Sequence, residues 1–267
     1  MIVLRNLLAV ATAVVVSVPA IWMLSTALKG PDEIFAQPLS LIPRPPRWEN
    51  FGEVWAVAPL ARYLVNSFFI ASAITGLEVT FGILAAYAFV RLPLPGGRAL
   101  FALFVATLFL PGQVIVIPNF VLMRLIGWVD SYPGLIVPPA CTAFATYYLG
   151  QQFRIFPREI ELAARVDGCD PLRALGLVVL PALRPALVAI VVLAFVAQWN
   201  AFFWPLVMTS SESLRTITLG LRYLADSVGP RYHLVMAGST LATLPPLFIF
   251  LLAQRHVRIN VLGVGLR

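Results

Sequence analysis

The residues with the clearest chemical pattern lie in one charged interval, residues 156–181, of an otherwise apolar chain. Pro157 suits the first position of a helix, because a proline there loses no hydrogen bond. Glu159 and Glu161 follow in the first turn, where the positive end of the helix dipole stabilises carboxylates. The sequence therefore predicts a helix that starts at Pro157 in contact with water.

Small residues mark one face of this predicted helix. Ile160, Ala163 and Ala164 lie at i, i+3 and i+4, so they share a narrow face that another surface can approach closely. Asp167 and Gly168 then supply the left-handed turn that ends a helix. Such a face suits recognition of another protein surface, but short helices also occur in loops that bind no partner, and the pattern alone leaves both interpretations open.

A second helix is predicted directly after the turn. Asp170 can cap it, and Pro171 suits its first position. It runs to Leu180 and ends before Pro181. The interval is therefore expected to form a helix, a sharp turn and a second helix.

A smaller set of polar residues lies within apolar segments. Glu78 is an acid at membrane depth, where an ionisable group is costly unless it faces a cavity or a partner. It is either a functional group, or a residue near a span end or paired with an arginine of a neighbouring subunit. Prolines inside the next segment are expected to bend that helix, and Pro138 and Pro139 to bend the one after it. Gln113 and Asn119 lie beside the prolines of the first of these two helices and are either part of a polar pathway or hydrogen-bonding contacts between helices.

Gln198, Trp199 and Asn200 form the other polar group. An aromatic face suits the C–H surface of a sugar, and amides suit its hydroxyl groups. The same residue types also serve ordinary packing between helices. Both interpretations stay open.

The elements that must position these residues are membrane helices. Hydrophobic residues make up 60% of the 267-residue chain, charged residues only 12%, and the mean hydropathy is +0.89. Soluble proteins carry about 25% charged residues. We expect an all-α polytopic membrane protein in which residues 1–267 form a single domain with six transmembrane helices, at about residues 7–28, 63–90, 99–124, 133–150, 182–209 and 234–253.

Arginines in the short loops set the expected orientation. Arg91, Arg98 and Arg165 fall on the same side as both termini. Arg5 lies near the N-terminus and Arg267 at the C-terminus of the sequence. Positive residues in short loops mark the cytoplasmic side, so both termini and residues 156–181 are expected there. The net charge of +7 therefore needs no nucleic acid to explain it. Cys141 and Cys169 are assigned to different layers, and no disulfide is predicted.

The spacing within the charged interval resembles the signature loop of importer-type ABC transporter permeases. The family pattern is Glu-Ala-Ala, three residues, Gly, nine residues, Ile, one residue and Leu-Pro. It stands here as Leu162, Ala163, Ala164, Gly168, Val178, Leu180 and Pro181. The string WNAFFWPL, the segment LPGQVIVIPNFVLMRLIGWVDSYPGLIVP and the Asn66-Ser67 pair are similar to the maltose and glycerol-phosphate permease-like group, which serves carbohydrate uptake.

This resemblance implies a permease subunit that forms half of a translocation pathway for a sugar or sugar-like solute. It implies partners: a second related permease, two ATPase subunits that bind ATP and Mg²⁺, an extracytoplasmic substrate-binding protein and the lipid bilayer. The cytoplasmic (inner) membrane of a bacterium or archaeon is the expected location. The chain itself needs no cofactor and is not an enzyme, and it has no G-x-x-x-x-G-K-[ST] phosphate loop.

Two sets of site residues follow from the resemblance and the residue types. The hairpin is expected to couple to an ATPase through Ile160, Glu161, Ala163, Ala164, Asp167 and Gly168. The solute pathway is expected to include Glu78, Gln113, Asn119, Gln198, Trp199 and Asn200. Leu162 departs from the family glutamate, and Glu161 lies about 100° around the helix from it, so Glu161 cannot replace that side chain directly.

Two other function classes are alternatives to an ABC importer permease. A self-sufficient secondary transporter or channel usually carries several ionisable residues in its spans, whereas only Glu78 is clearly intramembrane here. An intramembrane enzyme would need a nucleophile or metal ligands close to its histidines. His233 and His256 lie at or outside the predicted membrane boundaries, as interfacial side chains, far from such groups in the sequence.

Overall fold

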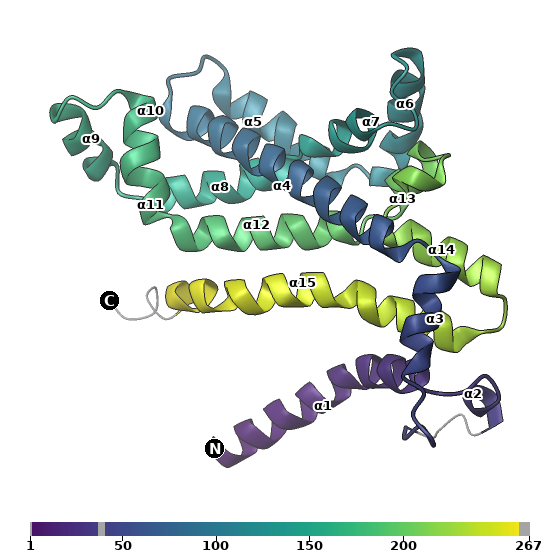
Figure 1. The fold of residues 1–267 in the computed structure, drawn as a ribbon. Coiled ribbons are helices and arrows are strands. Elements are labelled where there is room, and N and C mark those ends of the chain that lie inside the picture. The colour runs from purple at the N-terminus through teal and green to yellow at the C-terminus, as the bar shows by residue number, and fades with distance from the viewer. Residues whose placement is uncertain (1, 37–40, 262–267) are drawn as a thin grey trace. The chain divides into compact units, whose positions relative to one another are not determined.

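Helices form all the regular secondary structure in the described part of the chain (Figure 1). The computed structural model describes residues 2–36 and 41–261. The chain divides into two compact units, of which the first comprises residues 1–66 and 215–245 and the second residues 67–214 and 246–267. Gly263 and Arg267 of the predicted cytoplasmic tail lie outside the described residues.

The first unit holds the long N-terminal helix α1 (Ile2–Ala27) and several shorter elements. They are α2 (Glu33–Ala36), α3 (Glu49–Val57), α14 (Ile217–Val228) and the first parts of α4 (Leu60–Arg91) and α15 (Tyr232–Val261). The Asn50 amide joins α3 to the end of α1, because it donates to the carbonyls of Ala27 and Lys29 at 2.8 and 2.9 Å. His233, which the sequence placed at an interface, is buried at the start of α15.

The second unit carries most of the sequence-predicted site residues. After the greater part of α4 it contains α5 (Gly97–Ala106), η1 (Thr107–Phe109), α6 (Gly112–Leu125), α7 (Tyr132–Ile136), η2 (Pro138–Ala140) and α8 (Ala143–Ile155). Then follow α9 (Arg158–Val166), α10 (Pro171–Ala174), the π-helix η3 (Leu175–Val179), α11 (Leu180–Ala182), α12 (Arg184–Trp199), α13 (Phe203–Met208) and η4 (Glu212–Leu214).

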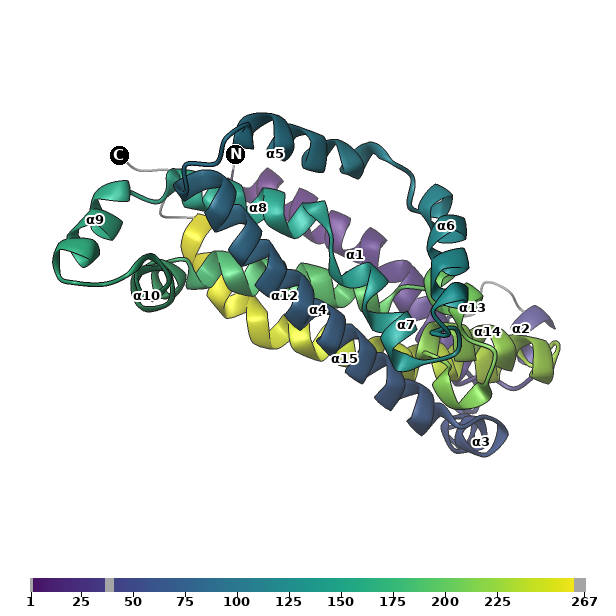
Figure 2. The ribbon, with the colours of Figure 1, turned by 90° about the horizontal axis from the view of Figure 1, so that it is seen from above.

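Helices α4, α8 and α12 lie side by side in this unit (Figure 2) and enclose its main apolar core. Ala86 of α4, Leu149 of α8 and Ile190 of α12 are fully buried there. The contact between α4 and α8 is close: a Cβ atom on Gly82 would lie 2.9 Å from the Cβ of Ala145. Small residues at this crossing therefore let the two backbones approach each other.

The predicted spans are confirmed in part. Among the described residues, three helices are long and apolar enough to cross a membrane, at Val3–Ala27, Leu60–Arg91 and Tyr232–Arg255, and they match the first, second and sixth predicted spans. Counting each of two bent helix pairs as one span gives up to five.

The third, fourth and fifth predicted spans are broken helices. Residues 99–124 bend by 101° between η1 and α6, at Pro111. Pro138 and Pro139 separate α7 from α8, whose 13 residues cover about 20 Å, less than the ~30 Å hydrocarbon core. Residues 182–209 divide into α12 and α13 after Asn200. The segment 210–233, which connects the fifth and sixth predicted spans, contains the helix α14.

Candidate functional site

The segment 156–181, called the coupling hairpin below, ends its first helix as the sequence predicts. Gly168 has a φ of +90°, and its amide donates to the carbonyl of Arg165 while that of Cys169 donates to the carbonyl of Ala164, both at 3.0 Å. This pair of bonds is the Schellman arrangement, in which a glycine accepts the left-handed conformation. The first helix starts one residue later than predicted, at Arg158, with Pro157 as its N-cap.

The second helix of the hairpin also has the predicted cap but not the predicted end. The carboxylate of Asp170 accepts hydrogen bonds from the amides of Leu172 and Arg173 at 3.0 Å each. The helix does not stop before Pro181: it continues through η3 and α11 to Ala182 and then bends by 83° into α12. Pro181 has no amide proton to donate, and it follows the π-helical turn η3, where the regular α-helical hydrogen-bond pattern is already interrupted.

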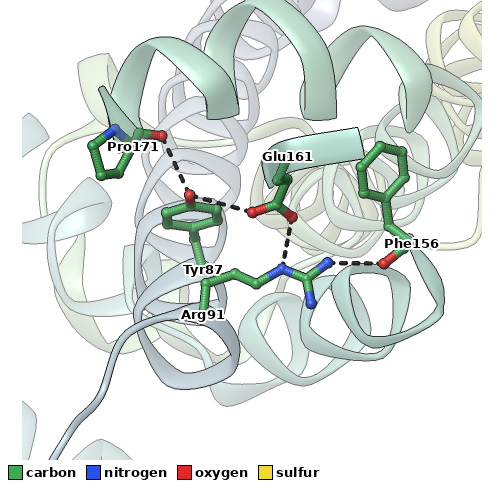
Figure 3. Close-up of polar contacts among 5 residues, drawn as sticks. All are labelled: Tyr87, Arg91, Phe156, Glu161 and Pro171. Carbon is green, nitrogen blue, oxygen red and sulfur yellow. Dashed lines mark hydrogen bonds and ion pairs between the residues drawn. The ribbon is translucent and has the colours of Figure 1, made fainter. Parts of the chain in front are cut away.

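A buried polar group, called the Arg91 cluster below, joins the hairpin to the end of α4 (Figure 3). Nε of Arg91 donates to Oε1 of Glu161 at 2.6 Å, and Nη2 of Arg91 donates to the carbonyl of Phe156 at 2.9 Å. The Tyr87 hydroxyl lies 3.5 Å from Oε2 of Glu161 and 3.3 Å from the carbonyl of Pro171. The side chains of Arg91 and Glu161 are 8% and 2% exposed.

This cluster contacts both helices of the hairpin and the loop before it. Breaking a buried pair from one side leaves an uncompensated charge, which costs about 3–5 kcal/mol. The hairpin is therefore held in a defined position against α4.

The structure divides the residues expected to couple to an ATPase. Ile160, Ala163, Asp167 and Gly168 are exposed, and so is Leu162, which stands at the family's glutamate position. Glu161 and Ala164 are buried against the chain itself. The accessible face of α9 is thus narrower than the sequence pattern suggested, because Ala164 lies on the inward side with Glu161.

The breaks in three helices meet at one cavity of about 510 Å³. Its lining comes from the start of α6, the segment between η2 and α8, and the start of α13, and includes the predicted pathway residues Gln113 and Asn119. Cys141, Thr142 and Trp204 also line it. Nε1 of Trp204 is buried and has no hydrogen-bond acceptor among the described residues. We call this cavity the broken-helix pocket.

Glu78 forms a second polar group beside this pocket, called the Glu78 cluster. Oγ1 of Thr142 donates to Oε1 of Glu78 at 2.5 Å, and the side chain of Gln198 also contacts the carboxyl group. The Glu78 side chain is buried near the middle of α4, and its Oε2 receives no hydrogen bond of normal geometry within the described residues. The structure therefore places Glu78 away from the ends of α4, while a functional role and pairing with an arginine of a neighbouring subunit both stay predictions.

Trp199 and Asn200 are not part of the pocket lining. Trp199 is 3% exposed and stacks on Phe195. The amide of Asn200 donates to the carbonyl of Val196 in its own helix at 2.8 Å. The six predicted pathway residues thus separate into a pocket pair, a pair in the Glu78 cluster and a pair elsewhere.

Sequence reasoning missed Tyr87, Arg91 and Thr142. Arg91 was predicted only as a short-loop arginine that marks the cytoplasmic side. The sequence carried only a weak signal for the Arg91 cluster, because Tyr87 and Arg91 lie at i and i+4 on one helix face. That Glu161 is buried, and so requires a partner, is known only from the structure. No comparable signal pointed to Thr142, which lies 64 residues from Glu78.

Comparison with known proteins gives the family directly. Residues 78–261 match the family model described as binding-protein-dependent transport system inner membrane component. The chain is 36% identical over 231 residues to the sn-glycerol-3-phosphate transport system permease protein of Yersinia enterocolitica, a match that covers 84% of this chain and 82% of the relative.

A second relative and a solved structure extend the match. The sulfoquinovosyl glycerol transport system permease protein of Agrobacterium fabrum is 30% identical over 255 residues, which cover 93% of this chain and 88% of the relative. A chain of a bacterial ABC transporter involved in the import of the acidic polysaccharide alginate shares the fold, with a TM-score of 0.82, 22% identity and 95% of each chain covered. The chain therefore belongs to the family of inner-membrane components of binding-protein-dependent transport systems, and it is a permease subunit of an ABC importer.

Proposed function

We propose that this permease forms half of the translocation pathway for a sugar-like solute and receives the force of ATP hydrolysis through the coupling hairpin. The observation that carries the proposal is the hairpin itself. Both of its helices are capped, and the Arg91 cluster holds them against α4. A segment held in this way transmits a displacement from a docked protein, whereas a loosely attached loop would absorb it.

The proposed assembly follows from the family and from charge. Two ATPase subunits bind and hydrolyse ATP, a second permease completes the pathway, and an extracytoplasmic binding protein delivers the solute. Six spans with both termini in the cytoplasm place the arginine-rich hairpin on the cytoplasmic side, as the positive-inside rule requires. In this arrangement the permease has no catalytic role.

The docking face is tested by a substitution at its centre. Replacing Ala163 with Arg places a long charged side chain on an exposed position of α9, where the ATPase must approach closely. We expect the tagged permease to insert normally but to lose most of the ATPase that co-purifies with it. Arg165→Glu, a charge change at an exposed position about 160° around the same helix from Ala163, is the control. Stoichiometric ATPase with the Ala163 variant would contradict docking at this face.

The solute class rests on the pocket and on the relatives. The broken-helix pocket offers the amides of Gln113 and Asn119, groups that suit the hydroxyls of a polyhydroxylated solute. The relatives are named for sn-glycerol-3-phosphate and sulfoquinovosyl glycerol. We therefore assign a sugar or a glycerol-containing solute with free hydroxyl groups to this pathway.

Transport kinetics test the pocket. Replacing Asn119 with Leu removes one hydrogen bond to the solute, which is worth about 0.5–1.5 kcal/mol, so the KM for uptake should rise about threefold to tenfold. Replacing Asn200 with Ala is the control, because its amide is bound to its own helix. An unchanged KM in the Asn119 variant, measured in proteoliposomes with the cognate binding protein, would exclude Asn119 from the solute path.

A further inference from the structure

One helix, α4, contributes residues to both the Arg91 cluster and the Glu78 cluster. Tyr87 and Arg91 hold the coupling hairpin at its end, and Glu78 contacts Thr142 in the wall of the broken-helix pocket. The 13 residues between Glu78 and Arg91 cover about 20 Å of continuous helix. Both clusters belong to the same compact unit.

The stretch of α4 between the clusters is packed tightly enough to move as one piece with α8. At Gly82 the two helices approach so closely that even a methyl group would lie 2.9 Å from Ala145. Val79, Ala86 and Tyr87 continue this contact into the core cluster with Leu149 and Phe153. Close-packed interiors have little compressibility and pass on a displacement.

The Glu78 end of the helix meets a point where backbone geometry can change. Thr142 immediately precedes α8, in the break that follows η2, and Gln198 lies near the end of α12, just before the break that leads to α13. The carboxyl group of Glu78 contacts both side chains. A shift of α4 therefore acts on two of the three helix breaks that line the pocket.

We propose that α4 is the mechanical link between the coupling hairpin and the solute pocket, with Arg91, Glu161 and Tyr87 as the positioning residues at one end and Glu78 at the other. Movement of the docked hairpin pulls on α4 through the Arg91 cluster. The helix passes this movement to Thr142 and Gln198 through the Glu78 cluster and so changes the shape of the pocket. The inference rests on the proposed docking of an ATPase at the hairpin.

A native thiol offers a reporter for this link. Cys141 is exposed, lines the pocket and is adjacent to Thr142, whereas Cys169 lies in the hairpin. In a Cys169→Ser background, Cys141 is the only thiol of the permease. Its rate of reaction with a small maleimide is measured in the complete reconstituted transporter, without nucleotide and with ATP and vanadate.

We expect the rate at Cys141 to depend on nucleotide in this background and to lose that dependence in Glu161→Gln and Tyr87→Phe. Solute moved per ATP hydrolysed should fall in the same variants. Glu159→Gln, an exposed acid on the same helix, should keep both properties. Because a single unpaired charge can impair folding, the double variant Arg91→Met with Glu161→Leu removes both charges and should assemble but remain uncoupled.

The experiment distinguishes failure of ATPase docking from failure of the link through α4. If the ATPase does not associate with the wild-type permease, the proposed docking function is wrong. If it associates but Cys141 shows no dependence on nucleotide, or if the assembled Arg91-cluster variants keep that dependence and the full transport ratio, the link through α4 is wrong.

Discussion

At the scale of single residues, Asp130 shows how one carboxylate can join two segments of this fold. It has a φ of 55°, in the left-handed region. Its Oδ1 accepts hydrogen bonds from the amides of Ser210 and Ser211 and from the hydroxyl of Ser211, each at 3.0 Å. Its own amide donates to the carbonyl of Met208. The turn after α6 is thereby attached to the segment after α13.

These hydrogen bonds make the stability of the fold depend on the ionisation of Asp130. The backbone amide of Ser211 is the main cause that lowers the pKa of Asp130, and it outweighs the opposing effect of burial. A lowered pKa in the folded state means that the stabilisation is present above the pKa of an unfolded aspartate, about 3.9. It is lost as the pH falls through the lower folded pKa.

Replacing Asp130 with Asn should therefore destabilise the protein by roughly 1 kcal/mol at neutral pH, because solvent weakens the contribution of a partly exposed charge. Thermal unfolding of the purified permease between pH 7 and pH 2 measures this. The difference from wild type should stay constant above about pH 5 and shrink below the carboxyl pKa. The exposed Asp32, changed to Asn, is the control. A difference that does not vary with pH would show that the charge of Asp130 is not the stabilising feature.

At the scale of elements, local signals predicted the hairpin well. Gly168 and the Asp170-Pro171 pair determine backbone conformation within a few residues, so their caps were predictable from sequence, and the structure confirms them. The hairpin face was predicted less well. Helical spacing alone does not show which side packs against the rest of the chain, and Ala164 lies inward because Glu161 reaches Arg91.

The pocket at the broken helices shows what the sequence could not predict. The prolines at positions 111, 138 and 139 predicted bent helices in the third and fourth spans, and the structure shows breaks at these positions. What the sequence did not predict is that the ends of these broken helices meet at one pocket. Convergence of segments that are far apart in the chain depends on tertiary packing, which single-sequence periodicity does not contain. For that reason Thr142 was not predicted as a partner of Glu78.

At the scale of the whole molecule, hydropathy and family resemblance predicted the class of protein, and both the family match and the relatives confirm it. The number of spans is a different matter. Helix length and composition support three to five candidate spans within the described residues, and six spans remain a prediction. The proposed topology needs an odd number of crossings between the coupling hairpin and the segment 210–233.

Accessibility of single cysteines tests this topology. In a permease without Cys141 and Cys169, a cysteine replaces either Val166 in the hairpin or Ser213 in segment 210–233, both exposed positions. The arginines around the hairpin favour the cytoplasmic side, so a membrane-impermeant maleimide should label the Ser213 variant in intact spheroplasts. The Val166 variant should react only after permeabilisation.

Each alternative labelling pattern has its own meaning. Labelling of both positions from outside would require an even number of crossings between them, and α12 with α13 would then return to the same side as a re-entrant hairpin. Exclusive labelling of Val166 would reverse the orientation and remove the hairpin from the cytoplasm. In either case an ATPase in the cytoplasm could not reach Ala163. If neither position reacts before permeabilisation, the hairpin lies in the cytoplasm but α12 and α13 do not cross the membrane once, and the proposed topology is wrong although an ATPase could still reach Ala163.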